Sequence, residues 1–264
     1  MKKIRLDQLV FDLGFTESRE RAKTTIMSGL VFVNGQRADK PGMSVSPDVD
    51  IEVRGNALPF VSRGGFKLDK ALKVFPIDPT GLHCIDCGAS TGGFTDVLLQ
   101  HGAEKVYAVD VGYGQLAWKL RNDERVVNLE RTNLRYITEE QIPELLDLAV
   151  MDVSFISIKL VLPAVKQLLK PGADYVCLIK PQFEAGKEEV GKKGVVRDKS
   201  VHERVVRDIL EFAPEIGFSV MGLDYSPIKG PEGNIEYICH LKNGVYDTPE
   251  IDIPAVVEAS HKAL

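Results

Sequence analysis

The chain has 264 residues, of which 44% are hydrophobic and 27% charged, values typical of globular proteins and unlike those of disordered or fibrous chains. Its apolar runs are far shorter than the ~18–20 residues that a membrane-spanning helix needs, and we expect no signal peptide at the N-terminus. Four scattered cysteines do not make a disulfide framework, so the expected location is the cytoplasm.

The net charge of −5 is unevenly distributed along the chain. Residues 1–73 hold 13 Lys and Arg against 9 Asp and Glu, for +4, whereas residues 74–264 hold 20 against 29, for −9. A basic N-terminal quarter followed by an acidic body predicts two units with different tasks. The acidic total therefore does not exclude a nucleic-acid partner.

The N-terminal quarter predicts two short helices. Apolar residues spaced as on one helix face run from Leu6 to Leu13, and Gly14 ends this first helix. The second helix is expected to begin near Thr16, whose hydroxyl can cap it, and to end at residues 28–29.

A small hairpin follows the helices. Residues 30–33 predict a short strand, and Asn34-Gly35 predicts a type I′ turn, in which both central residues need positive φ. A further strand is expected over residues 50–53.

Three sequence patterns in this quarter are shared with a known domain: R-L-D-x-x-L, then S-R-x-x-A-x-x-x-I-x-x-G-x-V-x-V-N-G, and the closing x-V-x-x-x-D-x-I-x-V. In these patterns the segment resembles the S4 RNA-binding domain, which implies an α+β unit over residues 1–55 that binds structured RNA. Judged by charge alone, the basic residues are equally well interpreted as an ordinary solvated helix face. The side chains expected to contact RNA phosphates are Lys3, Arg5, Arg19, Arg21, Lys23, Lys40 and Arg63.

Residues 56–63 predict a linker, because glycine, asparagine and proline around it leave no sustained periodicity. Residues 62–72 then predict a capped loop that leads into a helix bearing Lys67. By itself, Lys67 is better interpreted as a solvated lysine than as a catalytic one.

A glycine-rich turn follows a predicted strand over residues 82–87. Gly88, Gly92 and Gly93 allow the backbone to approach a ligand closely, and Asp86 ends the strand where open α/β sheets bind ligands. Asp110 ends the next strand, over residues 105–109, and is positioned to accept hydrogen bonds from ribose hydroxyls.

This layout is shared with NAD-binding proteins, but the glycine spacing fits neither G-x-G-x-x-G nor a phosphate-binding loop. An acid before the glycines disfavours a pyrophosphate and suits the positive end of S-adenosylmethionine, which we therefore favour over NAD. Residue 133, after a strand over residues 126–129, is expected to contact the adenine. The expected cofactor contacts are Asp86, Gly88, Ala89, Ser90, Gly92, Gly93, Phe94, Asp110, Val111, Asn133 and Asp152.

The pair Cys84-x-x-Cys87 could indicate zinc or redox chemistry. The other two cysteines are single and distant, and the pair spans a strand and its turn, so we expect no metal site.

Two more predicted strands end in ionisable residues, Asp152 after residues 148–151 and Lys180 after residues 174–179, and Glu236 lies on a strand over residues 233–239. A helix is expected over residues 161–169, stopped by the Lys-Pro-Gly that follows. Alternating strands and helices predict a largely parallel, doubly wound Rossmann-like sheet with ligands at its carboxyl edge.

Taken together, Lys67, Asp152, Lys180 and Glu236 resemble the lysine–aspartate–lysine–glutamate set of the FtsJ/RrmJ-like ribose 2′-O-methyltransferases. The segments SRGGFKL, DCGASTGGFTD, MDVSFIS, LIKPQFE and GNIEY extend this resemblance, with the S4 domain, to the TlyA/haemolysin A family. It implies a methyltransferase domain over residues 64–246, a C-terminal tail or helix over residues 247–264, and 2′-O-methylation of cytidine in ribosomal RNA. The implied partners are ribosomal RNA and ribosomal subunits, with no membrane and no stable protein partner.

A ribose 2′-hydroxyl is a poor nucleophile near neutral pH, so the reaction needs a base. A lysine can act as that base only if burial or a second cation lowers its pKa. We therefore hypothesise that Lys180 is the base and Lys67 the second cation, while Asp152 positions Lys180 and Glu236 orients a lysine or the ribose. Phe155 and Asn234 are expected to shape the pocket for a splayed-out nucleotide.

Two other classes of function remain as alternatives. A membrane-active haemolysin would need an exposed amphipathic or long apolar segment, which the sequence does not offer. A non-catalytic RNA-binding assembly factor would have no use for the four catalytic residues. The glycine-containing loop over residues 184–199 is interpreted equally well as a clamp on RNA or as an ordinary exposed loop.

Overall fold

The computed structural model divides the chain into two compact units, Met1–Val61 and Ser62–Leu264. It describes residues 3–13, 15–16, 18–47, 49–54, 59–191, 193–230 and 232–264. The division between the units falls within the linker expected at residues 56–63. Residues 55–58, and Gly14 at the expected end of the first helix, lie outside the described residues.

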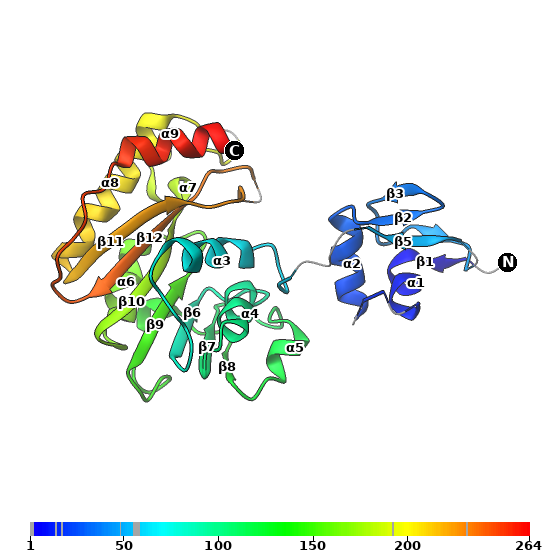
Figure 1. The fold of residues 1–264 in the computed structure, drawn as a ribbon, viewed down its shortest axis with the longest axis horizontal. Coiled ribbons are helices and arrows are strands. Elements are labelled where there is room, and N and C mark those ends of the chain that lie inside the picture. The colour runs from blue at the N-terminus through cyan, green and yellow to red at the C-terminus, as the bar shows by residue number, and fades with distance from the viewer. Residues whose placement is uncertain are drawn as a thin grey trace. The chain divides into compact units, whose positions relative to one another are not determined.

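The first unit is a small α+β fold, drawn in blue in Figure 1. One sheet pairs β1 with β4, and a second has the order β3-β2-β5, with all pairs antiparallel. Two helices pack on these strands around a core that includes Leu6, Val10 and Ile26. The elements are β1 (Ile4–Arg5), α1 (Leu6–Asp12), α2 (Arg19–Met27), β2 (Val31–Val33), β3 (Gln36–Ala38), β4 (Ser44–Val45) and β5 (Ile51–Val53).

Local chemistry explains the turns of this unit, with one correction to the sequence prediction. Asn34 and Gly35 have φ of 48° and 76°, as the expected type I′ turn requires. Helix α2 begins later than predicted, because Ser18 and not Thr16 is its N-cap: the Ser18 hydroxyl accepts a hydrogen bond from the backbone N–H of Arg21.

The second unit is a seven-stranded sheet with helices on both faces (Figure 1). Its strand order is β11-β12-β10-β9-β6-β7-β8, and only β12 runs antiparallel to its neighbours. The predicted Rossmann-like, mostly parallel sheet is thereby confirmed. The strands are β6 (His83–Cys87), β7 (Lys105–Val109), β8 (Val126–Leu129), β9 (Leu146–Met151), β10 (Leu169–Ile179), β11 (Phe218–Tyr225) and β12 (Tyr237–Asn243).

One face of the sheet forms the main core with α6, α8 and α9, and the other carries α3 and α4. Alternation along β6 shows the division: Ile85 and Cys87 join the main core, whereas Asp86 points to the opposite face and bonds to Thr95 of α4. The helices are α3 (Gly65–Val74), α4 (Gly93–Gln100), α5 (Trp118–Arg121), η1 (Leu134–Tyr136), η2 (Ile158–Leu160), α6 (Leu162–Lys166), α7 (Pro181–Glu184), α8 (Lys199–Glu215) and α9 (Ile253–Ala263).

Two predicted segments differ in the structure. The helix expected over residues 161–169 is shorter, because α6 ends at Lys166 and β10 begins at Leu169. The register of β10 against β9 then shifts between Leu169 and Asp174, where Gly172 has φ of 81°. The C-terminal segment, expected to be a tail or helix outside the methyltransferase domain, contains α9, which buries Ile253 and Val257 in the main core and so belongs to the second unit.

No helix among the described residues is long and apolar enough to cross a membrane.

A half-buried carboxylate, Glu144, stabilises the amino edge of the sheet. It accepts hydrogen bonds from Lys105 Nζ (2.8 Å) and the Tyr107 hydroxyl (2.5 Å), and it pairs with His83 Nδ1 (2.5 Å). The hydrogen bond from Lys105 and then that from Tyr107 lower the pKa of Glu144 to about 2. Since this pKa lies below that of an unfolded glutamate, the contribution to stability is present above pH ~4.5 and is lost as the pH falls through about 2.

We expect Glu144→Gln to lower the free energy of unfolding at pH 7 by about 1–2 kcal/mol, because the charge that Lys105 and Tyr107 stabilise is removed. The difference from the wild type should shrink below pH ~4. Chemical denaturation across this pH range measures both effects. Glu140→Gln, at an exposed carboxylate four residues earlier, is the control and should change little; an equal effect of the two variants would contradict the assignment.

Candidate active site

The sheet register brings the predicted catalytic residues to one edge. In β6, β9 and β10, Cys87 pairs with Met151 and Met151 with Cys177, so Asp152 and Lys180 both emerge at the carboxyl ends of parallel strands. Because β12 is antiparallel, its first residue, and not its last, lies at this edge. Glu236 immediately precedes β12, whose Tyr237 pairs with Ile179 of β10.

The four residues form a continuous chain of ion pairs. Lys180 Nζ lies 2.5 Å from Asp152 Oδ1, and Lys67 Nζ lies 3.0 Å from Asp152 Oδ2. Lys67 Nζ also lies 2.6 Å from Glu236 Oε2. Both lysine side chains are only 7% exposed and Glu236 1%, so these charges are held out of water by the fold. Sequence reasoning predicted all four members of this chain.

The ion pairs favour the charged forms of Lys67 and Asp152. Burial alone would raise the pKa of Asp152, but Lys67 and Lys180 overcome this effect and hold it below the usual value for an aspartate. Burial alone would likewise lower the pKa of Lys67, but Asp152 and Glu236 keep it above the usual value for a lysine. Lys67 is therefore the fixed cation of the set, and Asp152 lies between the two ammonium groups.

Two further residues shape this cluster, and sequence reasoning missed both. Ser154 Oγ accepts a hydrogen bond from Lys180 Nζ (2.9 Å) and so fixes the ammonium from a second direction. Gly230 leaves room for Glu236, since a Cβ there would lie 2.6 Å from Oε1. The sequence offered one local signal for Ser154, its position two residues after Asp152 at the carboxyl end of β9.

A cavity of about 340 Å³ opens beside Asp152 at the carboxyl edge, a size typical of sites for small ligands. It joins an acidic end, at Asp110 and Asp152, to an apolar wall. This combination fits S-adenosylmethionine, whose ribose hydroxyls need an acceptor and whose sulfonium favours a nearby carboxylate. The lining residues are Gly88, Ser90, Asp110, Val111, Gln115, Asn133, Leu134, Asp152, Val153, Ser154, Phe155, Ile156 and Val161.

The glycine-rich turn forms the floor of the cavity. Gly88 has φ of 84°, and a Cβ on it would lie 2.9 Å from the carbonyl oxygen of Asp152. Ser90 N donates to Asp110 Oδ2 (2.8 Å) and Gly112 N donates to Asp110 Oδ1 (2.7 Å), so the acid at the end of β7 is already oriented.

Five of the expected cofactor contacts do not line the cavity: Asp86, Ala89, Gly92, Gly93 and Phe94. Asp86 is buried beneath the turn, where its Oδ2 accepts hydrogen bonds from the backbone and hydroxyl of Thr95 (2.9 and 2.7 Å). Burial raises its pKa to about 7. Asp86 thus fixes the first turn of α4 from below, and its effect on a ligand is indirect.

Asn234 also has a different place from the one expected. Its side chain is buried, accepts from Val196 N (3.0 Å) and donates to the carbonyl of Gly194 (2.8 Å). It therefore anchors the loop after α7 and does not face a ligand. This loop also buries Val196, so its last part packs on the unit, while its Lys192 lies outside the described residues.

Phe155 is an exposed aromatic residue at the cavity. It is 92% exposed, lines the cavity and has φ of 65°, a strained conformation for a non-glycine residue. Its ring lies 5.2 Å from that of Phe183, which follows Lys180 by three residues.

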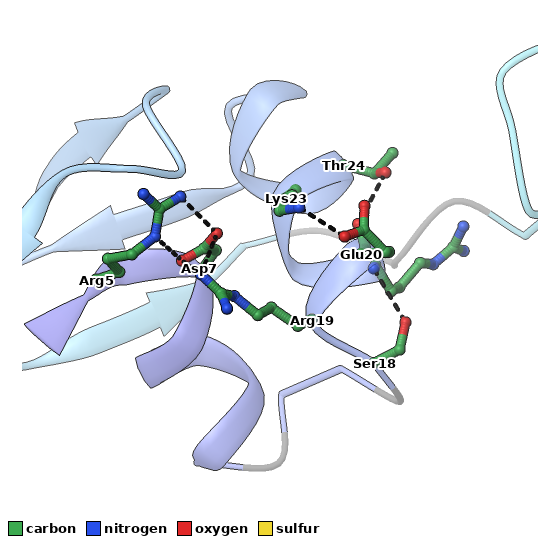
Figure 2. A network of polar contacts seen from close by, with 8 residues as sticks. Arg5, Asp7, Ser18, Arg19, Glu20, Lys23 and Thr24 are labelled. Atoms are coloured by element: carbon green, nitrogen blue, oxygen red, sulfur yellow. Dashed lines mark hydrogen bonds and ion pairs between the residues drawn. The ribbon is translucent and has the colours of Figure 1, made fainter.

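The basic residues expected to contact RNA differ in their surroundings. In the first unit, Arg5 and Arg19 both contact the buried Asp7, and Lys23 pairs with Glu20 (Figure 2). Arg21 Nη1 donates to the carbonyl of Phe60 (2.9 Å). Three others, Lys3, Lys40 and Arg63, are exposed.

Two features define the fold class of the second unit. Its sheet is mostly parallel with an antiparallel β12, and a glycine turn lies below a cavity at the carboxyl edge. The unit has the Rossmann-like fold of S-adenosylmethionine-dependent methyltransferases. The family model described as FtsJ-like methyltransferase matches residues 60–243, and the S4 domain model matches residues 4–51.

Similarity to individual proteins extends over nearly the whole chain. It is 52% identical to the YqxC protein of Bacillus subtilis, covering 100% of this chain and 96% of that one. It is 47% identical to the 16S/23S rRNA (cytidine-2′-O)-methyltransferase TlyA of Mycobacterium tuberculosis, covering 91% and 90%. A Streptococcus thermophilus protein of known structure that carries the haemolysin name superposes with a TM-score of 0.78 at 48% identity, covering 100% and 97%.

The chain therefore belongs to the TlyA/haemolysin A family, in which an S4 domain precedes an FtsJ-like methyltransferase domain. It is an enzyme, and S-adenosylmethionine is its cofactor. When bound, this cofactor supplies an electrophilic methyl group.

We expect Gly88→Ala to weaken binding of S-adenosylhomocysteine, the demethylated cofactor, by at least about tenfold, because the new methyl group meets the Asp152 backbone at the cavity floor. Isothermal titration calorimetry measures the affinity. Gly81→Ala is a matched control: Gly81 also has positive φ, 72°, but nothing lies within 4 Å of its Cβ position. If both variants bound the ligand equally well, the close approach at Gly88 would not matter for binding.

Proposed function

We propose that this protein transfers the methyl group of S-adenosylmethionine to the 2′-hydroxyl of cytidine in ribosomal RNA. Lys67, Asp152, Lys180 and Glu236 act as the catalytic tetrad. The observation that supports this proposal best is the buried chain of ion pairs beside the cofactor cavity. The partner is ribosomal RNA, free or in a ribosomal subunit, and the place of action is the cytoplasm.

The tetrad suits removal of a proton from a weakly acidic hydroxyl. With both lysines protonated, its two lysines and two carboxylates are neutral overall, and Lys180 must lose its proton to solvent before it can act as the base. Both lysines contact Asp152, which lines the cavity, and Lys180 also donates a hydrogen bond to Ser154, a second lining residue. As the methyl–sulfur bond breaks and the oxygen–methyl bond forms, the proton of the 2′-hydroxyl passes to the neutral amine of Lys180.

The other tetrad members hold Lys180 and the reacting groups in place. Asp152 binds Lys180 through one oxygen and Lys67 through the other, so its carboxylate plane is fixed. Glu236 neutralises Lys67, which would otherwise be an uncompensated buried charge when Asp152 interacts with the sulfonium. Phe155 provides an exposed ring on which the target base or its neighbour stacks.

Relatives with the TlyA name support the substrate in this proposal, because their names specify cytidine 2′-O-methylation of rRNA. The haemolysin name of other relatives supports a competing function at a membrane. A buried tetrad next to a cofactor cavity has no role in membrane lysis, and we therefore favour methylation.

The proposal is tested by incubating the purified protein and labelled S-adenosylmethionine with 30S and 50S subunits that lack the modification. We expect label in rRNA, at cytidines that mapping of 2′-O-methyl groups identifies. Label on a base, or on no RNA at all, would overturn the proposal. Release of haemoglobin from erythrocytes without any methyl transfer would support the membrane alternative.

We expect Lys180→Ala to lower the rate of methyl transfer by about 100- to 10,000-fold, because the base is lost, while the affinity for S-adenosylhomocysteine changes little. Single-turnover methylation and calorimetry measure the two quantities. Lys170→Ala is the control, since Lys170 lies in the same strand, β10, but pairs with Asp147 (2.6 Å) away from the cavity. Full turnover by Lys180→Ala would show that another group removes the proton.

A further inference from the structure

We propose that Asp7 is a positioning residue that makes Arg5 and Arg19 into a preformed clamp for an RNA phosphate. This inference rests on the proposed function, because it concerns how the S4 domain holds the RNA substrate. Asp7 carries the sign of charge that should repel RNA, and nothing in the sequence pattern assigns it a role in binding. Its surroundings point to the opposite effect.

The geometry of the cluster is that of one buried acceptor shared by two guanidinium groups. Arg5 binds Asp7 with two hydrogen bonds, Nε to Oδ1 (3.0 Å) and Nη2 to Oδ2 (2.9 Å). Arg19 Nη2 reaches both oxygens of the same carboxylate at 3.3 Å. Figure 2 shows the two arginines approaching Asp7 from different elements, Arg5 from β1 and Arg19 from the start of α2.

The backbone beneath this carboxylate is held as firmly as its side chain. Asp7 N donates to the carbonyl of Pro41 (3.0 Å), and Leu6 N donates to that of Met43 (2.8 Å). These bonds attach the first turn of α1 to the segment before β4. Asp7, which orients the two arginines, is therefore fixed to the rest of the S4 domain.

Burial makes the Asp7 contacts stronger than surface ion pairs. The Asp7 side chain is 0% exposed, whereas the side chains of Arg5 and Arg19 remain 51% and 41% exposed. The hydrogen bonds from Arg5, supported by Arg19, lower the pKa of Asp7 to about 2, so the carboxylate stays ionised at any physiological pH. By contrast, Lys23 pairs with Glu20, whose side chain is 80% exposed, and such a pair is easily broken.

The charge and the remaining donors of the cluster suit a phosphodiester. Two guanidinium groups and one carboxylate leave a net charge of +1, which one phosphate neutralises. The contacts with Asp7 use Nε and Nη2 of Arg5 and leave its Nη1 outside the pair. Arginines already held in place lose less conformational entropy on binding.

For Asp7→Asn, the expected change in RNA affinity is opposite to the change that its charge alone would cause. Removing a negative charge from an RNA-binding surface should tighten binding if only net charge mattered. We instead expect Asp7→Asn to weaken binding about 5- to 10-fold, because the two arginines lose their common anchor. The slope of log affinity against log salt should also decrease by about 1, as one phosphate contact is lost.

The experiment uses the full-length protein, with in vitro transcribed 16S and 23S rRNA as probes in filter binding over a series of KCl concentrations. Asp12→Asn is the matched control, since Asp12 lies in the same helix, is exposed, and its loss changes the net charge equally. It should leave binding unchanged or slightly tighter. Asp7→Asn that binds as tightly as Asp12→Asn would overturn the proposal.

A second pair of variants separates positioning from folding of the S4 domain. Arg5→Lys and Arg19→Lys preserve every charge but cannot reproduce the planar guanidinium contacts with Asp7. Both should bind rRNA more weakly at an unchanged far-UV circular dichroism spectrum, and wild-type affinity in both would overturn the proposal even if Asp7→Asn did not fold. Absence of rRNA binding by the wild type would instead overturn the proposed function itself.

Discussion

The candidate active site depends on a single carboxylate that two buried lysines share. Asp152 lies at the end of β9 with one oxygen on Lys180 and the other on Lys67, and Glu236 balances the second lysine. Each of these charges would be costly to bury alone, and removing one partner of such a pair typically costs about 3–5 kcal/mol. Helix α3, strand β10 and the segment before β12 must therefore meet where Asp152 lies.

The reversed direction of β12 allows Glu236 to lie at the same edge as Asp152 and Lys180. In an all-parallel sheet, the residue before a strand lies at the amino edge, far from the ligands. Reversal of β12 places Glu236 beside Lys180, next to the pair formed by Tyr237 and Ile179. The long loop before Glu236 is held by hydrogen bonds from Ser226 N to the Glu236 carbonyl and from Gly230 N to the Asn234 carbonyl. The same loop carries Asn234, which anchors the segment before α8.

The two units share one electrostatic arrangement, to which we assign different roles. In each, a buried carboxylate organises two cationic side chains: Asp152 with two lysines, and Asp7 with two arginines. The lysines are buried and compensated by a second carboxylate, an arrangement suited to moving a proton. The arginines are half exposed and keep a net positive charge, an arrangement suited to holding an anion. We infer that burial of the cations, more than the number of charges, distinguishes the proposed catalytic cluster from the proposed phosphate-binding cluster.

The sequence by itself determined the mostly parallel sheet, the glycine turn and the four ionisable residues at strand ends or in α3, because periodicity, turn chemistry and motif spacing are local properties. It could not determine that Asp86 supports α4 from below, that Asn234 holds a loop, or that Ser154 contacts Lys180. Those roles depend on which face of a strand a side chain takes and on partners up to 40 residues away. Only the tertiary structure decides such contacts, because the free energy of a buried polar group is set by whatever the fold brings within hydrogen-bond distance.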